Sequence, residues 1–336
     1  MFVIQKTDVA SILNSFNLPC DFIGFDLLSY YQQADLIGMI ICVYYGQNDK
    51  KYIIKLISSE NNNIQREHLQ AEFSEKVRGV GLNVPRKYKS GGCYCKNVTF
   101  CNTLFVVSIE DFLGNDVTNP TPQLAMFLGT SLGRMHEFAY SEGVYIGCGA
   151  TYKAIVRETA TFDRISSHFP PECISKEYYD SILCHHNSVL NELSRLWPNL
   201  PKATTHSDLG LLNNVVSYNA EYGIIDFNLA GDEVLISDFL ITWYSSIYDF
   251  DFINKSRTYD IGELKDAYWN GYQTHRIIHD KERSIIPSLS QFLNGIYFTK
   301  YVDTLFFRGC HEKAHSLVHL IDKHYSNTEA LVDLSL

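Results

Sequence analysis

The chain has 336 residues and a net charge of −10, with 46% hydrophobic and 20% charged residues. This composition is ordinary for a globular protein and excludes a disordered chain. The negative charge argues against nucleic-acid binding, which needs clustered Lys and Arg to meet phosphates. The sequence has no run of about 18 apolar residues, so no membrane span is predicted.

Nine cysteines are scattered along the chain without the paired spacing of a zinc site. We interpret them as reduced thiols, mostly core filler, in a cytosolic protein. The first six residues lack a basic region followed by a long apolar run, so no signal peptide is expected. A cytoplasmic location is therefore predicted.

The first part of the chain is predicted to be rich in strands, with one main helix. A short helix is expected over 8–18, ended by Pro19, and the main helix over 63–79. β-branched and aromatic runs bounded by turn residues predict strands. These strands are expected at 22–32, 36–47, 51–57, 86–92, 97–101 and 104–109.

After Asn119-Pro120 the pattern becomes mainly helical. Apolar residues recur at three- and four-residue spacing over 124–140. Further segments are predicted as helices at 152–168 and 176–196, a β pair at 214–218 and 222–227, and a mostly helical region over 236–330. We therefore predict an α+β chain with a small β-sheet lobe over 1–110 and a larger, mostly helical lobe over 111–336. That outline alone fits many proteins.

The segment from Thr205 to Asn213 carries the most chemical information. Phosphoryl transfer needs a carboxylate to take or orient the proton of the attacking hydroxyl, and hard oxygen ligands to hold Mg²⁺. Asp208 stands five residues before Asn213, and Asp226 ends a strand shortly afterwards. This spacing favours Asp208 towards substrate, with Asn213 and Asp226 on the metal.

These residues also resemble a known family. His206-x-Asp208-Leu209-x-x-x-Asn213, followed by Ile225-Asp226-Phe227, is similar to the H-G-D-L-H-x-x-N loop and I-D-[FW] strand of the aminoglycoside phosphotransferase and choline kinase-like proteins. The segment 128–136 resembles the first large-lobe helix of that family. The resemblance covers about residues 20–245, and it implies the protein-kinase-like two-lobed fold.

Three departures from the family pattern stand out. Ser207 replaces the usual Gly of the loop, and Gly210 replaces its second His. The segment 29–37, where the loop covering the nucleotide is expected, has no glycine-rich signature. Tight nucleotide binding depends on whether backbone amides there grip the phosphates.

The resemblance implies ATP, or GTP, bound with Mg²⁺ between the two lobes. It gives Lys55, on the third strand, contact with the α- and β-phosphates. It makes Asp208 the residue that orients and deprotonates the substrate hydroxyl, and it makes Asn213 and Asp226 the metal ligands.

The carboxylate partner of Lys55 is open from sequence. The family uses a Glu on the small-lobe helix, and Glu67 fits that place best. Glu72 is an alternative, while an ungapped count back from Pro85 reaches Gln70. Glu110 and the neighbouring Asp111 are interpreted as solvated charges of the connector between lobes.

The family phosphorylates hydroxyls of small molecules such as aminoglycosides, macrolides, choline and homoserine. The acidic, aromatic-rich composition slightly favours an amine-bearing or hydrophobic acceptor. An aromatic cluster near the end of the motif is interpreted as core: Trp243, Tyr244, Tyr248, Phe250 and Phe252.

Two alternatives to a small-molecule kinase remain. An inactive pseudokinase that acts as a binding or scaffold module is favoured by the missing glycine loop, and opposed by the intact Asp208, Asn213 and Asp226. A protein kinase ranks lower, because the sequence lacks the A-P-E signature of an activation segment. The sequence gives no oligomeric state.

Overall fold

The computed structural model describes residues 4–33, 36–46, 50–58, 63–100, 102–147, 175–249, 252–253 and 259–329. The predicted helix at 152–168 lies outside these residues. The chain divides into two compact units, Met1–Asn115 with Val216–Asn228, and Asp116–Val215 with Leu229–Leu336. The segment 216–228 belongs to the first unit, although the predicted boundary at 110/111 assigned it to the second lobe. The functional division at that boundary stays a prediction.

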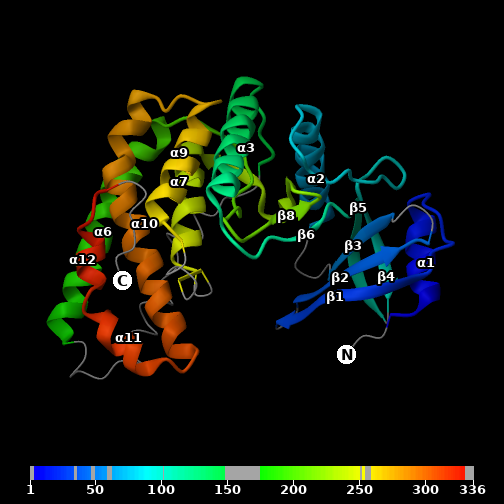
Figure 1. The fold of residues 1–336 in the computed structure, drawn as a ribbon, viewed down its shortest axis with the longest axis horizontal. Coiled ribbons are helices and arrows are strands. Elements are labelled where there is room, and N and C mark those ends of the chain that lie inside the picture. The colour runs from blue at the N-terminus through cyan, green and yellow to red at the C-terminus, as the bar shows by residue number, and fades with distance from the viewer. Residues whose placement is uncertain are drawn as a thin grey trace. The chain divides into compact units, whose positions relative to one another are not determined.

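The first unit contains a five-stranded antiparallel sheet with the order β1-β2-β3-β5-β4 (Figure 1). Its elements are α1 (Lys6–Ser15), β1 (Gly24–Gln33), β2 (Leu36–Tyr44), β3 (Lys51–Ser58), α2 (Ile64–Gly79), β4 (Cys95–Phe100) and β5 (Thr103–Asp111). β8 (Val215–Tyr218) and β9 (Glu221–Ile224) form a hairpin, with the two-residue strand β6 (Asn115–Asp116) beside β8. The predicted small antiparallel sheet with one main helix is confirmed.

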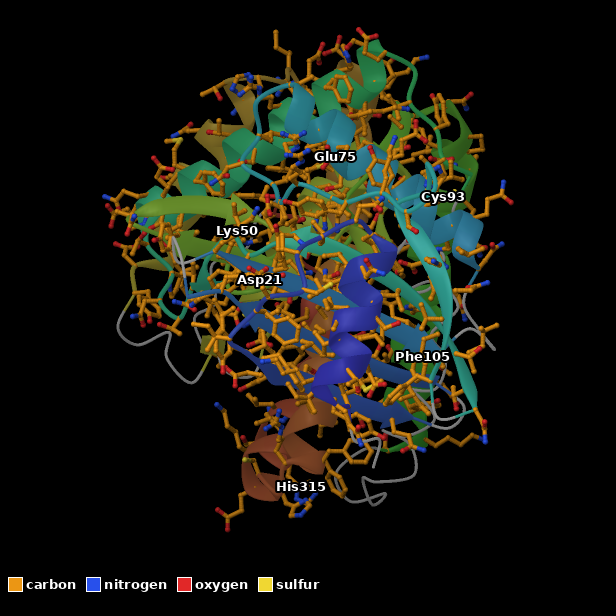
Figure 2. The ribbon with its side chains drawn as sticks, turned by 90° about the vertical axis from the view of Figure 1, so that its right-hand side faces the viewer. Asp21, Lys50, Glu75, Cys93, Phe105 and His315 are labelled. Atoms are coloured by element: carbon orange, nitrogen blue, oxygen red, sulfur yellow. The ribbon has the colours of Figure 1, made fainter. Side chains whose placement is uncertain are left out.

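Helix α1 lies across one face of this sheet (Figure 2). Its buried residues Val9, Ile12 and Leu13 recur at three- and one-residue spacing and continue into Phe16, which makes an apolar stripe on one side of the helix. The stripe packs against apolar side chains of β2, β3 and β5. Because side chains alternate along a strand, the residues between these apolar ones point to the opposite face of the sheet.

That alternation places two charged residues on the face away from α1. Ile54 and Leu56 on β3 belong to the core under α1, and so does Ile109 on β5. Lys55 therefore points to the other face, and so does Glu110. Lys55 pairs with Ser108 across the ladder, two residues from Glu110, which is a diagonal distance that long side chains bridge.

The predicted strand at 86–92 is wrong. Lys87 makes only an isolated bridge to Glu110. The chain then turns at Gly91 and Gly92, whose φ angles of +58° and +92° lie in the left-handed region that interrupts a strand.

The second unit is mostly helical, as predicted (Figure 1). Its elements are α3 (Pro122–Ser141), α6 (Lys176–Leu196), η1 (Trp197–Asn199), β7 (Lys202–Thr205), β10 (Gly231–Val234), α7 (Leu235–Ile247), α9 (Ile261–Gln273), α10 (Asp280–Phe307), α11 (His311–Val318) and α12 (Ile321–Tyr325). The antiparallel pair β7–β10 was not predicted. Among the described helices, none is long and apolar enough to cross a bilayer.

Helices α3 and α9 approach closely because small residues stand where they cross. A Cβ added to Gly129 would lie 2.0 Å from the carbonyl oxygen of Tyr268, and one added to Gly271 would lie 2.4 Å from that of Met126. Neither backbone oxygen has room to move, so only glycine fits at these two positions. The glycine at position 129 of α3, within the segment 128–136, is therefore required by the packing of the two helices.

The packing of α6 against α10 and α12 gives the protein an acid-sensitive group. His186 is buried, its Nδ1 lies 3.0 Å from the hydroxyl of Tyr325, and its ring packs on Phe292. Burial lowers the pKa of His186 to about 4, whereas an unfolded His has a pKa of about 6.5. Between about pH 6.5 and pH 4, His186 is therefore protonated in the unfolded chain but neutral in the folded chain.

We expect the free energy of unfolding to fall between about pH 6.5 and pH 4, by on the order of 3 kcal/mol from this residue. His186→Gln keeps an acceptor for Tyr325 but does not titrate. In urea denaturation from pH 7 to 4, its free energy of unfolding should therefore fall less than that of the unmodified protein. His185→Gln is the matched control, because this neighbour is half exposed, and it should decline like the unmodified protein. Equal slopes for both variants would contradict the assignment.

Candidate active site

The loop that carries Asp208 leaves β7 with a strained turn. Ser207 has φ +68°, in the left-handed region that favours glycine, and its hydroxyl lies 2.8 Å from that of Thr205. A residue with a Cβ costs about 1–2 kcal/mol in this conformation. Ser207 therefore replaces the family's glycine at a position whose backbone conformation favours glycine. The contact between the hydroxyls of Ser207 and Thr205 offsets part of this cost.

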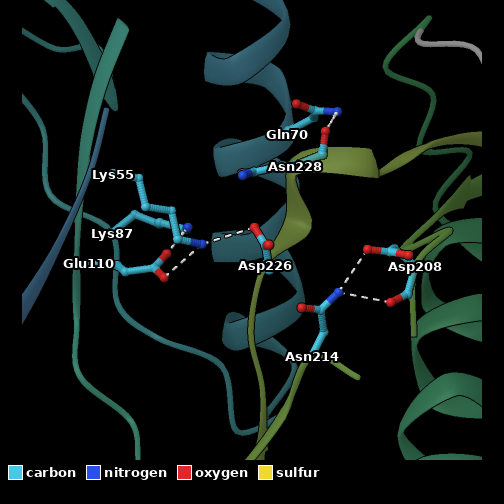
Figure 3. A network of polar contacts seen from close by, with 8 residues as sticks. All are labelled: Lys55, Gln70, Lys87, Glu110, Asp208, Asn214, Asp226 and Asn228. Carbon is cyan, nitrogen blue, oxygen red and sulfur yellow. Dashed lines mark hydrogen bonds and ion pairs between the residues drawn. The ribbon is translucent and has the colours of Figure 1, made fainter. Parts of the chain in front are cut away.

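Two asparagines fix Asp208. The Nδ2 group of Asn213 donates to the carbonyl oxygen of Asp208 at 2.9 Å. The Nδ2 group of Asn214 donates to the same carbonyl oxygen at 2.9 Å and to the carboxylate oxygen Oδ2 at 3.0 Å (Figure 3). Because the nitrogen of Asn213 is used in this way, its Oδ1 is the side-chain atom left for a cation. Asn214 was not singled out from the sequence.

The rest of the loop is closed on itself and tied to α7. Gly210 and Asn213 exchange two backbone hydrogen bonds of 3.1 and 3.2 Å, which closes a tight turn. The N–H of Leu211 donates to the hydroxyl of Ser246 on α7 at 2.8 Å. Asp208 is therefore held by both its own loop and a buried helix.

A cavity of about 510 Å³ opens beside Asp208 within the second unit. It is lined by Val117, Thr118, Asp208, Gly210, Leu212, Asn213, Ser245, Ser246, Asp249 and Phe252. Two of these lining residues are carboxylates and none is basic. The cavity therefore combines hydroxyl and amide groups with a local excess of negative charge.

In the first unit, four charged residues form a chain of alternating sign (Figure 3). The Nζ of Lys55 lies 3.0 Å from Oδ1 of Asp226 and 3.1 Å from Oε1 of Glu110. The other oxygen of Glu110, Oε2, pairs with the Nζ of Lys87. Three of the four are buried, at 6% exposure for Lys55, 3% for Glu110 and 8% for Lys87, while the side chain of Asp226 is 31% exposed.

The charges in this chain stabilise one another. Burial alone would lower the pKa of Lys55, but the carboxylates of Glu110 and Asp226 outweigh it and raise that pKa above its ordinary value. Burial alone would raise the pKa of Glu110, but Lys55 and Lys87 hold it below its usual range. Lys55 and Glu110 are therefore both charged at neutral pH.

The ion pair of Lys55 with Glu110 corrects one interpretation made from the sequence. Glu110 is buried and paired, so its interpretation as a solvated connector charge was wrong. The carboxylate that Lys55 contacts in the small sheet comes from β5, the neighbouring strand, because the ladder register brings Glu110 within reach of it. A role for Glu67 in cofactor binding stays a prediction. Glu67 is half-buried in the first turn of α2.

The other two candidate partners on α2 are engaged elsewhere. Glu72 pairs with Lys76 on the surface of the helix at 3.4 Å. Gln70 is buried, and its Nε2 donates to the carbonyl oxygen of Asn228 at 2.7 Å (Figure 3). Gln70 thus fastens α2 to the turn that follows Asp226, a link that no sequence signal revealed.

Asp226 stands in a conformation that is rare for a residue with a side chain. It follows β9 and has φ +63°, in the left-handed region. Such conformations cost about 1–3 kcal/mol and persist where the surroundings enforce them, often at functional sites. Here the ion pair with Lys55 and the Gln70 bond just beyond hold the turn in place.

Several other residues of the second unit are buried in its core. Asp238 is buried, and its Oδ2 lies 3.0 Å from Nε2 of His136 on α3. Of the aromatic cluster, Trp243, Tyr244 and Tyr248 are buried core residues, as predicted. Phe252 is buried too, yet it lines the cavity beside Asp208, while residue 250 lies outside the described residues.

Metal binding stays a prediction. Within the part of the chain that the structure describes, no group of three or more His, Cys, Asp or Glu side chains is arranged to hold a metal ion. The expected ligands, one Asn and one Asp, present the hard oxygen atoms that Mg²⁺ prefers.

Comparison with known proteins places the fold. The sequence matches no protein-family model, and it matches no curated protein. Solved structures are similar, among them an amicoumacin kinase in complex with AMP-PNP and Ca²⁺, at 15% identity over 98% of this chain and 96% of that chain, with a TM-score of 0.64. A microcompartment-associated aminopropanol kinase gives 13% identity over 96% and 95%, with a TM-score of 0.58.

An aminoglycoside phosphotransferase from Alicyclobacillus acidocaldarius gives 12% identity over 89% of both chains, with a TM-score of 0.59. These similarities extend over nearly the whole chain. Because the identities are only 12–15%, they establish a shared fold and nothing finer. The resemblance stated from the loop motif is thereby confirmed at the level of the fold. The chain has the kinase-like α+β fold of the aminoglycoside phosphotransferases and related small-molecule kinases.

Proposed function

We propose that the protein is a phosphotransferase that moves the γ-phosphoryl group of ATP or GTP onto a hydroxyl of a small molecule. The observation that carries this proposal is the fixed Asp208 beside a polar cavity, held through its carbonyl and carboxylate by two asparagine amides. The proteins that share the fold include kinases and a phosphotransferase for small molecules.

Four of the five predicted site residues, all except Glu67, take a role in the proposed reaction. Lys55 binds the nucleotide phosphates as a buried ammonium group, and Asp208 orients the acceptor hydroxyl and takes its proton. A magnesium ion would be held by Asp226 and by Oδ1 of Asn213, and would supply charge neutralisation at the phosphates. The chemistry of the two residues fits such an ion, since Asn213 keeps its Oδ1 for a ligand and Asp226 is a partly exposed carboxylate. Most of the rate gain comes from positioning.

The acceptor class follows from the charge of the cavity. Asp249 follows the C-terminal end of α7 and brings one carboxylate to the cavity, where its Oδ1 accepts a hydrogen bond from the backbone N–H of Phe252 at 3.0 Å. Asp208 adds a second negative charge, and none of the described residues that line the cavity is basic. We therefore propose an acceptor alcohol that carries a protonated amine, with Phe252 and Leu212 contacting its apolar part.

Transfer from γ-labelled ATP or GTP with Mg²⁺ tests this proposal on a panel of amino alcohols, aminoglycosides and macrolides. Each acceptor with a primary or secondary amine is paired with its N-acetylated counterpart, which keeps the hydroxyl but loses the charge. We expect transfer to free amines, with kcat/KM lower by about tenfold or more after acetylation. Nucleotide binding in a thermal-shift assay without transfer to any acceptor would favour the pseudokinase. Equal transfer to both members of each pair would contradict the amine class.

A further inference from the structure

Lys87 and its ion pair are unexplained by the roles assigned so far. The Lys87 side chain is 5% exposed, and one buried carboxylate, Glu110, serves both its ammonium group and that of Lys55. A single Lys–Glu pair would already be neutral. A second buried ammonium is costly to desolvate, so its presence needs a counter-charge beyond Glu110.

The structure holds Lys87 in place from α2 as well. Its backbone N–H donates to Oε1 of Glu75 at 2.6 Å, and Glu75 also accepts from the guanidinium of Arg78. The ammonium of Lys87 is thereby directed at Glu110 from the side opposite Lys55, one on each carboxylate oxygen.

The charge count shows what Lys87 does. Lys87, Glu110 and Lys55 together carry one net positive charge, which Asp226 balances in the structure. If Asp226 serves as a metal ligand, as in the proposed function, the positive charge is left for the nucleotide phosphates. Without Lys87, Glu110 would neutralise Lys55 completely, and the phosphates would meet a neutral pair.

We propose that Lys87 is a positioning residue for nucleotide binding: by pairing with Glu110, it leaves the Lys55 ammonium with net positive charge for the phosphates. This inference rests on the proposed function, since it requires a phosphate-bearing ligand at Lys55. In this proposal Lys55 is supported by Glu110, on β5, and by Lys87, in the segment after α2.

The test compares ligands that differ in charge. Dissociation constants for adenosine, ADP and ATP, or the guanine series if GTP is preferred, are measured by calorimetry in Mg²⁺ buffer without an acceptor. For Lys87→Met we expect affinity for the triphosphate to fall by about tenfold or more, a smaller loss for the diphosphate, and less than about twofold for the nucleoside. Lys87→Arg keeps the charge and should restore most of the affinity.

A double variant separates charge from structure. Glu110→Gln added to Lys87→Met frees Lys55 from its neutralising carboxylate, so affinity for the triphosphate should recover towards that of the unmodified protein. A purely structural role for Lys87 predicts the reverse, a further loss. Lys89→Met is the matched control, because Lys89 is exposed two residues further on and its Nζ lies 4.6 Å from the centre of the Tyr94 ring.

The outcomes distinguish the two proposals. An unmodified protein that binds neither nucleotide series would remove the proposed function. If it binds nucleotide, but Lys87→Met loses nucleoside and triphosphate affinity equally or loses neither, the role of Lys87 is overturned. Melting temperatures of all variants, measured alongside, confirm that the comparison is made on folded protein, and Lys87→Gln replaces Lys87→Met if the latter does not fold.

Discussion

Replacing Asp208 with Asn is expected to lower kcat by about 10³-fold, within the range of 10²- to 10⁴-fold that a positioned acid or base contributes. The substitution is isosteric, so the amide side chain keeps an oxygen to accept from Nδ2 of Asn214, and the carbonyl bonds from both asparagines are untouched. What is lost is the negative charge that, in the proposed function, orients the hydroxyl and takes its proton.

The nucleotide affinity of this variant should stay within about threefold, because Lys55 and its partners belong to the other compact unit and keep their charges. Rapid-quench measurement of the transfer step, together with calorimetric nucleotide binding, checks both statements. Asp180→Asn, at an exposed position on α6, is the control for loss of one negative charge. Loss of nucleotide binding in a folded Asp208→Asn protein would count against the role given to Asp208.

The sequence predicts local structure well wherever one periodicity dominates. Helix α6 is expected at 176–196 and spans Lys176–Leu196, because its apolar residues recur at helical spacing and Ser175 caps its start. The strands of the sheet fall within a few residues of their predicted places for the same reason. The prediction for 86–92 is wrong because its β-like residues are followed by two glycines whose left-handed conformation a local pattern does not reveal.

Contacts between distant segments are less predictable. Glu110 has the local pattern of a surface charge because nothing near it in sequence is basic, whereas strand register alone brings it to Lys55, 55 positions earlier in the chain. An ungapped count back from Pro85 places Gln70 where the partner of Lys55 is expected, which predicts a weakened ion pair for Lys55. The amide of Gln70 instead bonds Asn228, 158 positions away, and no local pattern specifies that contact.

Asp208, Asn213 and Asp226 illustrate the opposite case. Their spacing in the sequence predicts a chemistry, because a short loop and the hairpin after it constrain where these residues fall, and that chemistry stays a prediction. The structure adds how Asp208 is held, through Asn214, and how Asp226 is held, through Lys55 and the turn beyond it. The motif therefore predicts which residues act, and the contacts around Asp208 and Asp226 describe how these two are held.

The second large effect is expected at the turn between α9 and α10, where a charged pair is entirely buried. Arg276 and Glu282 have side chains 1% and 0% exposed, and Nη2 of Arg276 donates to both oxygens of Glu282 at 2.9 Å. Nη1 of the same residue donates to the hydroxyl of Tyr272 at 3.0 Å.

The bonds continue from Tyr272 to α3 and α7. The hydroxyl of Tyr272 lies 3.0 Å from Nδ1 of His136, and Nε2 of His136 lies 3.0 Å from Asp238. Burial lowers the pKa of His136 despite the Asp238 carboxylate, so the ring is neutral. One assignment then satisfies the chain, with Arg276 donating to Tyr272, Tyr272 donating to His136, and His136 donating to Asp238.

Glu282→Gln is expected to reduce the free energy of unfolding by about 3–5 kcal/mol, because it leaves the Arg276 guanidinium buried without a counter-charge. The melting temperature should fall by roughly 5–15 °C, read by calorimetry and by urea denaturation. Glu137→Gln, exposed beside His136 on α3, is the control and should change stability by less than about 0.5 kcal/mol.

Removing both charges should reduce the free energy of unfolding less than removing one. In Arg276→Met/Glu282→Leu no ion remains to be desolvated, so much of the lost stability should return, although Tyr272 loses its donor. The single variant exposes the cost of an orphaned buried charge, and the double variant measures the net value of the pair. If the double variant is as unstable as Glu282→Gln, the instability comes from packing at the turn, and the buried charge is not its cause.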